Sequence, residues 1–246
     1  MKFPGDRRTQ WEVMASAPVD LRAPEQDDVG HRESGRGSRA RPPLVFFLAL
    51  LLLAGVVGWW IGLPDDDGYN DVDVGFLSDM TVHHEGAISL GFDYLGREHD
   101  PLVGHFAREI ILVQAQQMAT MNSLLVDAGN PETAGDDVAM DWMGHPVTTA
   151  RMPGLATEAD FAELRAAQGI TADDVFTRLM IRHHAAGAVM ADDAARNGSN
   201  QKVRSLAESM AKVQRLEIAE MNHRRTELGL PIVDTSEFED LAQHGR

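Results

Sequence analysis

Two Met-x-x-His-His motifs are the residues of this chain that could bind a metal ion. They occupy Met80–His84 and Met180–His184, one hundred residues apart in the numbering. Thioether sulfur and imidazole nitrogen, in the absence of thiolate, suit copper better than other common metals. The chain contains no cysteine, so any soft-metal site must use these two side-chain types. The repeated motif therefore predicts a metal site, with copper as the expected ion.

The sequence repeat continues beyond these motifs into a second pair of matching segments. Ala107–Asn122 aligns with Ala207–Asn222 in the same register. Each segment carries a Gln-(x6)-Met pattern, which begins at Gln114 in the first copy and at Gln214 in the second. The chain therefore holds two copies of one two-helix unit.

Helical spacing turns the motif residues of each copy toward its apolar side. Because a helix advances by about 100° per residue, the inward residues of the first copy fall within an arc of about 100°. That arc contains Phe76, Met80, His83, His84 and Ala87. We therefore expect a domain centre that holds the four motif histidines, several thioethers and two glutamines.

A purely structural role for the histidines is the alternative interpretation. Buried imidazoles need hydrogen-bond partners, and Gln114 and Gln214 could supply them in a polar layer without metal. Zinc with histidine ligands is a further alternative, in which methionine would contribute little. A di-iron centre is the least favoured, because such a bundle needs about four glutamates and two Glu-x-x-His motifs. Glu85 has Ala185 as its counterpart in the repeat, so the required carboxylates are missing.

Four long helices, two in each copy, are expected to position these residues. Short turns within each copy predict antiparallel helical hairpins, which can bury their apolar stripes against each other as a four-helix bundle. Asp100-Pro101 is a helix start, and Thr171 with Asp174 resembles a capping box. The expected helices cover about residues 73–97, 100–129, 171–198 and 199–228.

A long connector, residues 130–169, separates the two hairpins. A short helix, Glu158–Gln168, is expected within it, with Thr157 as its cap. Connections of this length usually cover something or are mobile. The connector also contains side chains that could form a soft-metal lid or an apolar flap, namely Met140, Met143, His145 and Met152.

Residues Pro43–Leu63 form an uncharged apolar run that is long enough to cross a bilayer as a helix. Arginines precede the run and aspartates follow it, which predicts a cytoplasmic N-terminus and an extracytoplasmic domain at the plasma membrane. An uncleaved anchor is favoured over a signal peptide, whose apolar region would be shorter. The expected parts are a disordered cytoplasmic tail, a transmembrane anchor, a linker, an exported bundle and a C-terminal tail, at residues 1–42, 43–63, 64–72, 73–230 and 231–246.

The doubled motif resembles a known bacterial family, domain of unknown function 305. The likeness is carried by the Met-x-x-His-His segments, the Gln-(x6)-Met helices and Met152-Pro-Gly, and it covers about residues 71–228. It implies an all-α, ferritin-like four-helix bundle in an exported or membrane-anchored protein, and some members are linked to copper binding and copper tolerance. By this resemblance, the metal ligands are expected among Met80, His83, His84, Met180, His183, His184, Met118, Met121 and Met221.

These observations favour a membrane-anchored binding protein that sequesters copper or hands it on. The net charge of −16 makes a nucleic-acid partner a poor candidate, and the sequence shows no nucleophile–base pair or phosphate loop. Two other functions stay open. The domain could be an accessory subunit of a membrane complex or a homo-oligomer with a structural histidine core, or it could be a metal-dependent, ferritin-like oxidoreductase.

Overall fold

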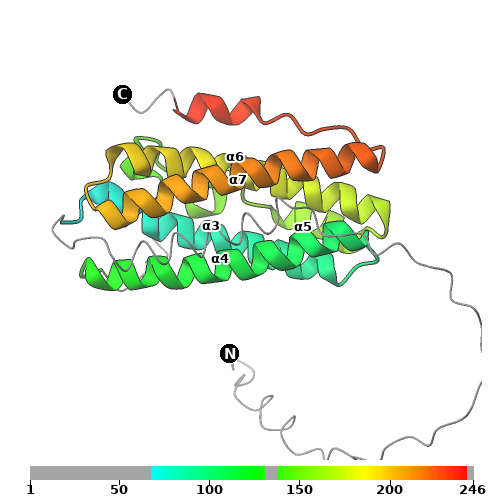
Figure 1. Cartoon of the computed structure of the whole chain (residues 1–246), viewed down its shortest axis with the longest axis horizontal. Helices are drawn as coiled ribbons and strands as arrows, with labels where there is room; N and C mark the ends of the chain where they lie inside the picture. The colour runs from blue at the N-terminus through cyan, green and yellow to red at the C-terminus, as the bar shows by residue number, and fades with distance from the viewer. Residues whose placement is uncertain (1–67, 131–137, 243–246) are drawn as a thin grey trace, which may run out of the picture. The chain divides into compact units, whose positions relative to one another are not determined.

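Two helical hairpins form most of the computed structural model, which describes residues 68–130 and 138–242 (Figure 1). The first hairpin pairs helix α3 with α4, and the second pairs α6 with α7. The hairpins meet mainly through α3 and α6, and the shorter helix α5 contacts both of these. The bounds of the helices are Asp71–Leu95 for α3, Pro101–Asp127 for α4, Glu158–Ala166 for α5, Ile170–Asn197 for α6 and Gln201–Glu227 for α7. The expected all-α class and the two paired hairpins are confirmed.

Short elements fill the connector between the hairpins and the segment after α7. Strands β1 (Val138–Ala139) and β2 (Val147–Thr148) pair antiparallel, with Val138 opposite Thr148. Three short 3-10 helices complete the described residues: η2 at Asp141–Met143, η3 at Thr149–Arg151 and η4 at Ser236–Ala242. The expected short helix of the connector is confirmed as α5.

Helix caps explain where the long helices begin. Asp100 accepts hydrogen bonds from two backbone amides of the first turn of α4, and Pro101 follows it, as expected. Thr157 and Asp160 form the capping box of α5. The prediction that Thr171 caps α6 is wrong. The helix begins at Ile170 after Gly169, whose φ of 55° is a left-handed conformation that favours glycine.

Two aspartates at matching positions of the repeat link the hairpins to each other. Asp73 Oδ2 on α3 accepts hydrogen bonds from the backbone amides of Ser199 and Asn200, both at 3.0 Å, in the loop before α7. Asp173 Oδ1 on α6 accepts one from the backbone amide of Asp100 at 3.0 Å, in the loop before α4. Each first helix thus holds the inter-helix loop of the opposite hairpin, and the sequence repeat becomes a structural one.

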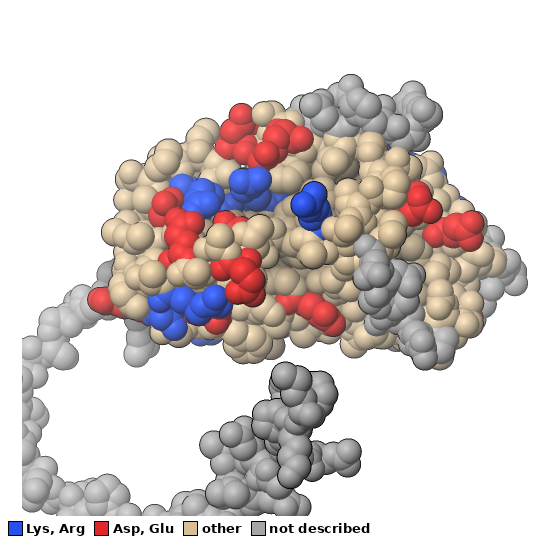
Figure 2. All heavy atoms as spheres, turned by 180° about the vertical axis from the view of Figure 1, so that it is seen from behind, with Lys and Arg blue, Asp and Glu red and all other residues tan. Residues whose placement is uncertain are grey.

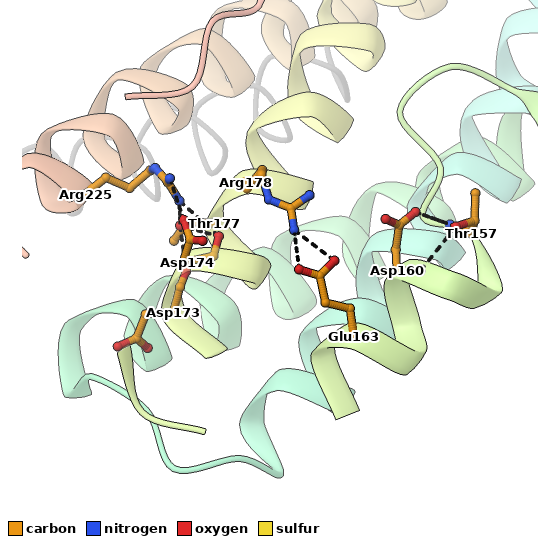
Figure 3. A network of polar contacts seen from close by, with 8 residues as sticks. All are labelled: Thr157, Asp160, Glu163, Asp173, Asp174, Thr177, Arg178 and Arg225. Atoms are coloured by element: carbon orange, nitrogen blue, oxygen red, sulfur yellow. Dashed lines mark hydrogen bonds and ion pairs between the residues drawn. The ribbon is translucent and has the colours of Figure 1, made fainter. Parts of the chain in front are cut away.

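Arg225 joins the end of α7 to α6 and to the segment beyond α7. Its side chain is only 2% exposed. The guanidinium donates to Asp174 Oδ1 at 2.6 Å, to Thr177 Oγ1 at 2.7 Å and to the Pro231 carbonyl at 2.7 Å. Figure 3 shows the first two contacts beside the Arg178–Glu163 pair that ties α6 to α5. The residues after α7, expected only as a tail, are therefore held against α6.

Apolar side chains of the described residues gather in two main clusters along the helices. One contains Met80 and Met121 together with Phe76, and the other contains Met180 and Met221. Both clusters draw on each hairpin, so neither hairpin has a core of its own. Among the described residues no helix is long and apolar enough to cross a membrane. The predicted span at residues 43–63 lies outside those residues.

Candidate metal centre

The four motif histidines lie in the interior, as the helical spacing predicts. His83 and His84 on α3 are 0% exposed, and His183 and His184 on α6 are 2% and 0% exposed. Because α3 and α6 form the main contact between the hairpins, the two His-His pairs approach each other there. One cluster of imidazoles results, built equally from both copies of the repeat.

The rings of His83 and His183 stack on each other, with centroids 3.8 Å apart and an angle of 23° between their planes. The connector covers this pair. His83 Nε2 hydrogen-bonds the carbonyl of Pro153 at 3.1 Å, and His183 hydrogen-bonds the backbone of Gly154. Gly154 has a φ of 84°, and a Cβ there would lie 2.8 Å from Ala186 Cβ. Only glycine allows the connector to pass so close to the histidines.

The other two histidines bond to side chains of the second helix in each hairpin. His84 Nε2 lies 2.7 Å from Gln117 Oε1, and His184 Nε2 lies 2.7 Å from Glu217 Oε2. Gln117 and Glu217 occupy matching positions of the repeat, so an amide on one side corresponds to a carboxylate on the other. The suggestion that Gln114 and Gln214 are the hydrogen-bond partners of the histidines is wrong.

Several buried polar atoms of this cluster have no hydrogen-bond partner. They are His83 Nδ1, His84 Nδ1, His183 Nε2 and both amide atoms of Gln214. Gly187 allows the Gln214 amide to lie close, because a Cβ there would stand 2.6 Å from Gln214 Oε1 and 3.2 Å from His83 Cε1. Unpartnered buried polar atoms are costly and rare, so their concentration in one place points to a ligand.

Three of the imidazoles have the hydrogen-bonding pattern of metal ligands. A metal-binding histidine usually donates its other ring N–H to an oxygen, which fixes the tautomer and the ring orientation. His83 and His84 each have one nitrogen on an oxygen atom and the other without a partner, and His183 also has a nitrogen without a partner. His184 differs, because its Nδ1 lies 3.0 Å from the Met180 carbonyl and its Nε2 faces Glu217. The donor set therefore fits a metal ion that prefers nitrogen.

The present side-chain arrangement is not yet a coordination shell. Throughout residues 68–130 and 138–242, no three His, Asp or Glu side chains are grouped closely enough to hold an ion. A metal lies in the plane of its imidazole at about 2 Å from nitrogen, and the nearly parallel planes of His83 and His183 do not meet at such a distance. One of the two rings must rotate before both can bind the same ion.

The predicted thioether ligands lie in the interior but not in one group. Met80, Met121 and Met180 are 0% exposed and Met221 is 1% exposed, whereas Met118 is half-buried. Met80 and Met121 belong to one apolar cluster, with Met118 packed against it, and Met180 and Met221 belong to the other. The structure therefore brings the histidines of the two repeats together and keeps the methionines of the two repeats in separate clusters.

Burial keeps the central imidazoles neutral. Loss of solvation, followed by the nearby His84, lowers the pKa of His83 to about 3. Burial likewise lowers the pKa of His84 to about 4 and moves that of His183 well below its usual value. Metal binding requires a deprotonated nitrogen, so at neutral pH these residues present lone pairs without first losing a proton.

Glu217 is not among the site residues predicted from the sequence, although the helical spacing puts it on the inward stripe of its helix. The prediction that the centre lacks the carboxylates of a di-iron site rests on Glu85, which has no counterpart in the repeat and is exposed. Glu217 on α7 instead reaches the buried His184. The pKa of Glu109 is raised to about 8, first by burial and then by the nearby charges of Glu217 and Glu220. The position of Glu217 on the inward stripe of α7 is the sequence feature that indicates a carboxylate near the buried histidines.

The residues of the helical hairpins match a known protein family. The family model described as "Domain of unknown function (DUF305)" matches residues 73–225. A DUF305 protein of Streptomyces coelicolor, named as a candidate secreted protein, is 31% identical to this chain. The match covers 66% of this chain and 97% of the Streptomyces chain, with a TM-score of 0.61. A DUF305 fragment from Deinococcus radiodurans is 30% identical, with coverages of 65% and 99% and a TM-score of 0.55.

A more distant solved structure is that of CopM in its Cu(I)-bound form. It is 25% identical to this chain over 63% of this chain and 96% of its own, with a TM-score of 0.47. No curated protein matches the chain.

Proposed function

Because the chain belongs to the DUF305 family, we propose that its helical domain binds copper reversibly, to sequester it or to pass it on. The supporting observation is the set of three buried, neutral imidazoles whose second nitrogens have no partner. His83, His84 and His183 are the proposed ligands. Each would bind through the nitrogen that now lacks a hydrogen bond.

Copper is preferred because of the side chains that surround these nitrogens. The chain offers no thiolate, and the centre has imidazoles with thioethers in the adjoining apolar clusters. Cu(I) accepts both donor types. Zinc would favour a closed tetrahedral shell of four ligands, and His184 has both of its nitrogens engaged.

The connector is the proposed gate of the site. The carbonyl of Pro153 and the backbone of Gly154 hold the stacked rings of His83 and His183. If either ring rotates toward an ion, its hydrogen bond to the connector must adjust. Loading and release of copper would therefore be accompanied by movement of residues 152–154.

The exported location and the full bundle architecture are part of the same proposal. We place the domain outside the plasma membrane, anchored by residues 43–63, and we regard the paired hairpins as a ferritin-like four-helix bundle. On the face shown in Figure 2, acidic and basic side chains lie in neighbouring patches, and the basic side chains form no continuous surface. That distribution suits a small cation better than a nucleic acid.

The experiment compares Cu(I) binding by the full-length chain in detergent with that of the double variant His83→Phe and His183→Phe. Phenylalanine keeps the stacked pair of rings and removes their nitrogens. A chromophoric Cu(I) chelator in competition should show at least a hundred-fold weaker binding by the variant. His223→Ala, which replaces a histidine whose side chain is 78% exposed, is the control. Unchanged affinity in the folded double variant would mean that the histidine core is structural.

A further inference from the structure

The side-chain amide of Gln214 is a polar group of the histidine core that the proposed ligands leave unused. The residue is only 3% exposed, and neither Oε1 nor Nε2 has a hydrogen-bond partner. An amide that is buried without partners costs free energy. Glutamine at this position is therefore unfavourable for stability alone, and a ligand that binds to the amide would reduce that cost.

Gly187 on α6 brings this amide next to His83. A Cβ at position 187 would stand 2.6 Å from Gln214 Oε1, 3.2 Å from Gln214 Nε2 and 3.2 Å from His83 Cε1. The amide and the edge of the His83 ring therefore meet above the same backbone atom. Cε1 is bonded to Nδ1, which is the nitrogen of His83 without a partner. The unused amide thus lies beside a proposed metal ligand.

The two copies of the repeat differ at this place. Gln214 corresponds to Gln114 in the first copy, and Gly187 corresponds to Ala87. Ala87 carries the methyl group that Gly187 lacks, so the first copy does not leave the same space beside its helix. Both glutamines are 3% exposed. The chain therefore contains two equally buried glutamines at matching positions, with different room beside them.

Contacts between α6 and α7 hold the Gln214 amide in this position. Gln214 and Glu217 lie on one face of α7, because residues three apart on a helix are neighbours. Glu217 Oε2 lies 2.7 Å from His184 Nε2 on α6, which directs that face toward the histidines. Gln214 follows the same face and lies against Gly187. The amide is therefore positioned by the helices, not by the connector.

The donors without partners in the core are nitrogen and oxygen atoms, whereas the connector methionines lie elsewhere. Met140, Met143 and Met152 are buried in an apolar cluster. Thioether sulfur favours Cu(I), while nitrogen and oxygen donors suit Cu(II), and a glutamine oxygen can serve as a weak axial ligand of copper. An amide oxygen beside imidazoles therefore adds more to the binding of Cu(II) than to that of Cu(I).

We propose that Gln214 Oε1 is an additional ligand of Cu(II) in the core and sets how strongly the site holds Cu(II) relative to Cu(I). This inference rests on the proposed copper-binding function and deepens it by naming the residue that determines the preferred oxidation state. His83, His84 and His183 bind copper in both oxidation states. Gln214 strengthens the Cu(II) complex alone.

The test measures the affinities of the full-length chain in detergent for Cu(II) and, without oxygen, for Cu(I), each against a chromophoric chelator. Gln214→Leu removes the oxygen and keeps a side chain of similar size. It should weaken Cu(II) binding at least ten-fold and leave Cu(I) binding unchanged. A ten-fold change in this ratio raises the reduction potential of the bound copper by about 59 mV. Gln214→Met, which supplies a thioether instead, should also weaken Cu(II) binding and should bind Cu(I) at least as tightly as the wild type.

Gln114→Leu is the matched control, because it makes the same change at the equivalent position of the first copy. It should leave both affinities and the EPR spectrum of bound Cu(II) unchanged, whereas Gln214→Leu should alter that spectrum. An equal effect of the two substitutions on the ratio of affinities would overturn the role of Gln214.

Two further results would overturn the proposal. One is a wild-type ratio of affinities in Gln214→Leu and Gln214→Met, and the other is an equal loss of Cu(II) and Cu(I) binding, as expected of a structural amide. Should Gln214→Leu not fold, Gln214→Met alone decides. Failure of the core proposal looks different, because the His83→Phe, His183→Phe variant would then keep every bound ion in both oxidation states.

Discussion

His83 and His183 come from equivalent positions of two sequence repeats, and their imidazole rings stack with centroids 3.8 Å apart in the interior. The contact joins one hairpin to the other and lies directly beneath the connector. Both residues are part of the proposed metal site, so the same contact that supports the fold must open for both to bind one ion.

The buried histidines should make the fold less stable in acid. The pKa values of His83 and His84 are about 3 and about 4 in the folded chain, below the unfolded value of about 6.5. The unfolded chain therefore binds more protons below pH 6.5, and stability falls as the pH drops from there toward the folded-state values. Each histidine contributes a slope of at most about 1.4 kcal/mol per pH unit.

Urea unfolding between pH 7 and pH 4 measures this slope. Replacement of His83 by Phe should remove the contribution of His83 to this slope. The control His223→Ala, at an exposed position, should leave the slope unchanged. An identical slope in the wild type and His83→Phe would show that His83 is not held neutral by burial.

Gly154→Ala should disturb the connector where it covers His83 and His183. The residue has a φ of 84°, and the added Cβ would lie 2.8 Å from Ala186 Cβ and 3.1 Å from His83 Nε2. We expect a loss of about 1–3 kcal/mol in stability and faster release of bound copper to a chelator. Gly144→Ala is the control, because Gly144 has a φ of 75° but no atom within 4 Å of a Cβ. Equal effects of the two substitutions on copper release would contradict the gating role of the connector.

The link between the hairpins through Asp73 can be tested by Asp73→Ala. This change removes the acceptor of the Ser199 and Asn200 backbone amides, and it should cost about 2–4 kcal/mol in the free energy of unfolding. Asp71→Ala, an exposed residue of the same helical turn, should cost less than about 0.5 kcal/mol. Similar urea midpoints for the two variants would rule out the proposed importance of this link.

Glu217→Gln makes the second repeat match Gln117 of the first. Burial is the largest cause that raises the pKa of Glu109 to about 8, and the negative charge of Glu217 is the next. Removal of the Glu217 charge should therefore lower the pKa of Glu109. A ¹³C carboxyl NMR titration of Glu109 reads this directly. Glu208→Gln, at an exposed position of the same helix, should leave the pKa of Glu109 unchanged. A Glu109 pKa that stays the same in Glu217→Gln would show that the two carboxylates do not interact.

The repeat and its periodicity were sufficient to predict the helices and the direction of the histidines. A residue that recurs on the apolar stripe of two matching helices must face the common interior, and His83, His84, His183 and His184 do so. The caps at Asp100 and Thr157 were equally readable, since each is a local pattern of a few residues. The cap proposed at Thr171 is wrong because the N-cap is Gly169, two residues earlier, and the helix begins at Ile170.

Partners between helices were not predictable in the same way. The periodicity of one helix does not give its axial offset against another, so Gln117 and Glu217 could not be preferred over Gln114 and Gln214 as partners of the histidines. The reciprocal contacts of Asp73 and Asp173 depend on the same offset. The packing of Phe238 against Ala185 and Ala186 joins segments that carry no common pattern.

Nitrogen-15 NMR of the histidine side chains, recorded as Cu(I) is added to the full-length chain in detergent, tests the central claim most directly. Cu(I) is diamagnetic, so each imidazole nitrogen can be followed. The account predicts large shifts of His83 Nδ1, His84 Nδ1 and His183 Nε2, the atoms without partners, with the exposed His223 unaffected. Shifts confined to exposed histidines, or none in the core at saturation, would contradict it.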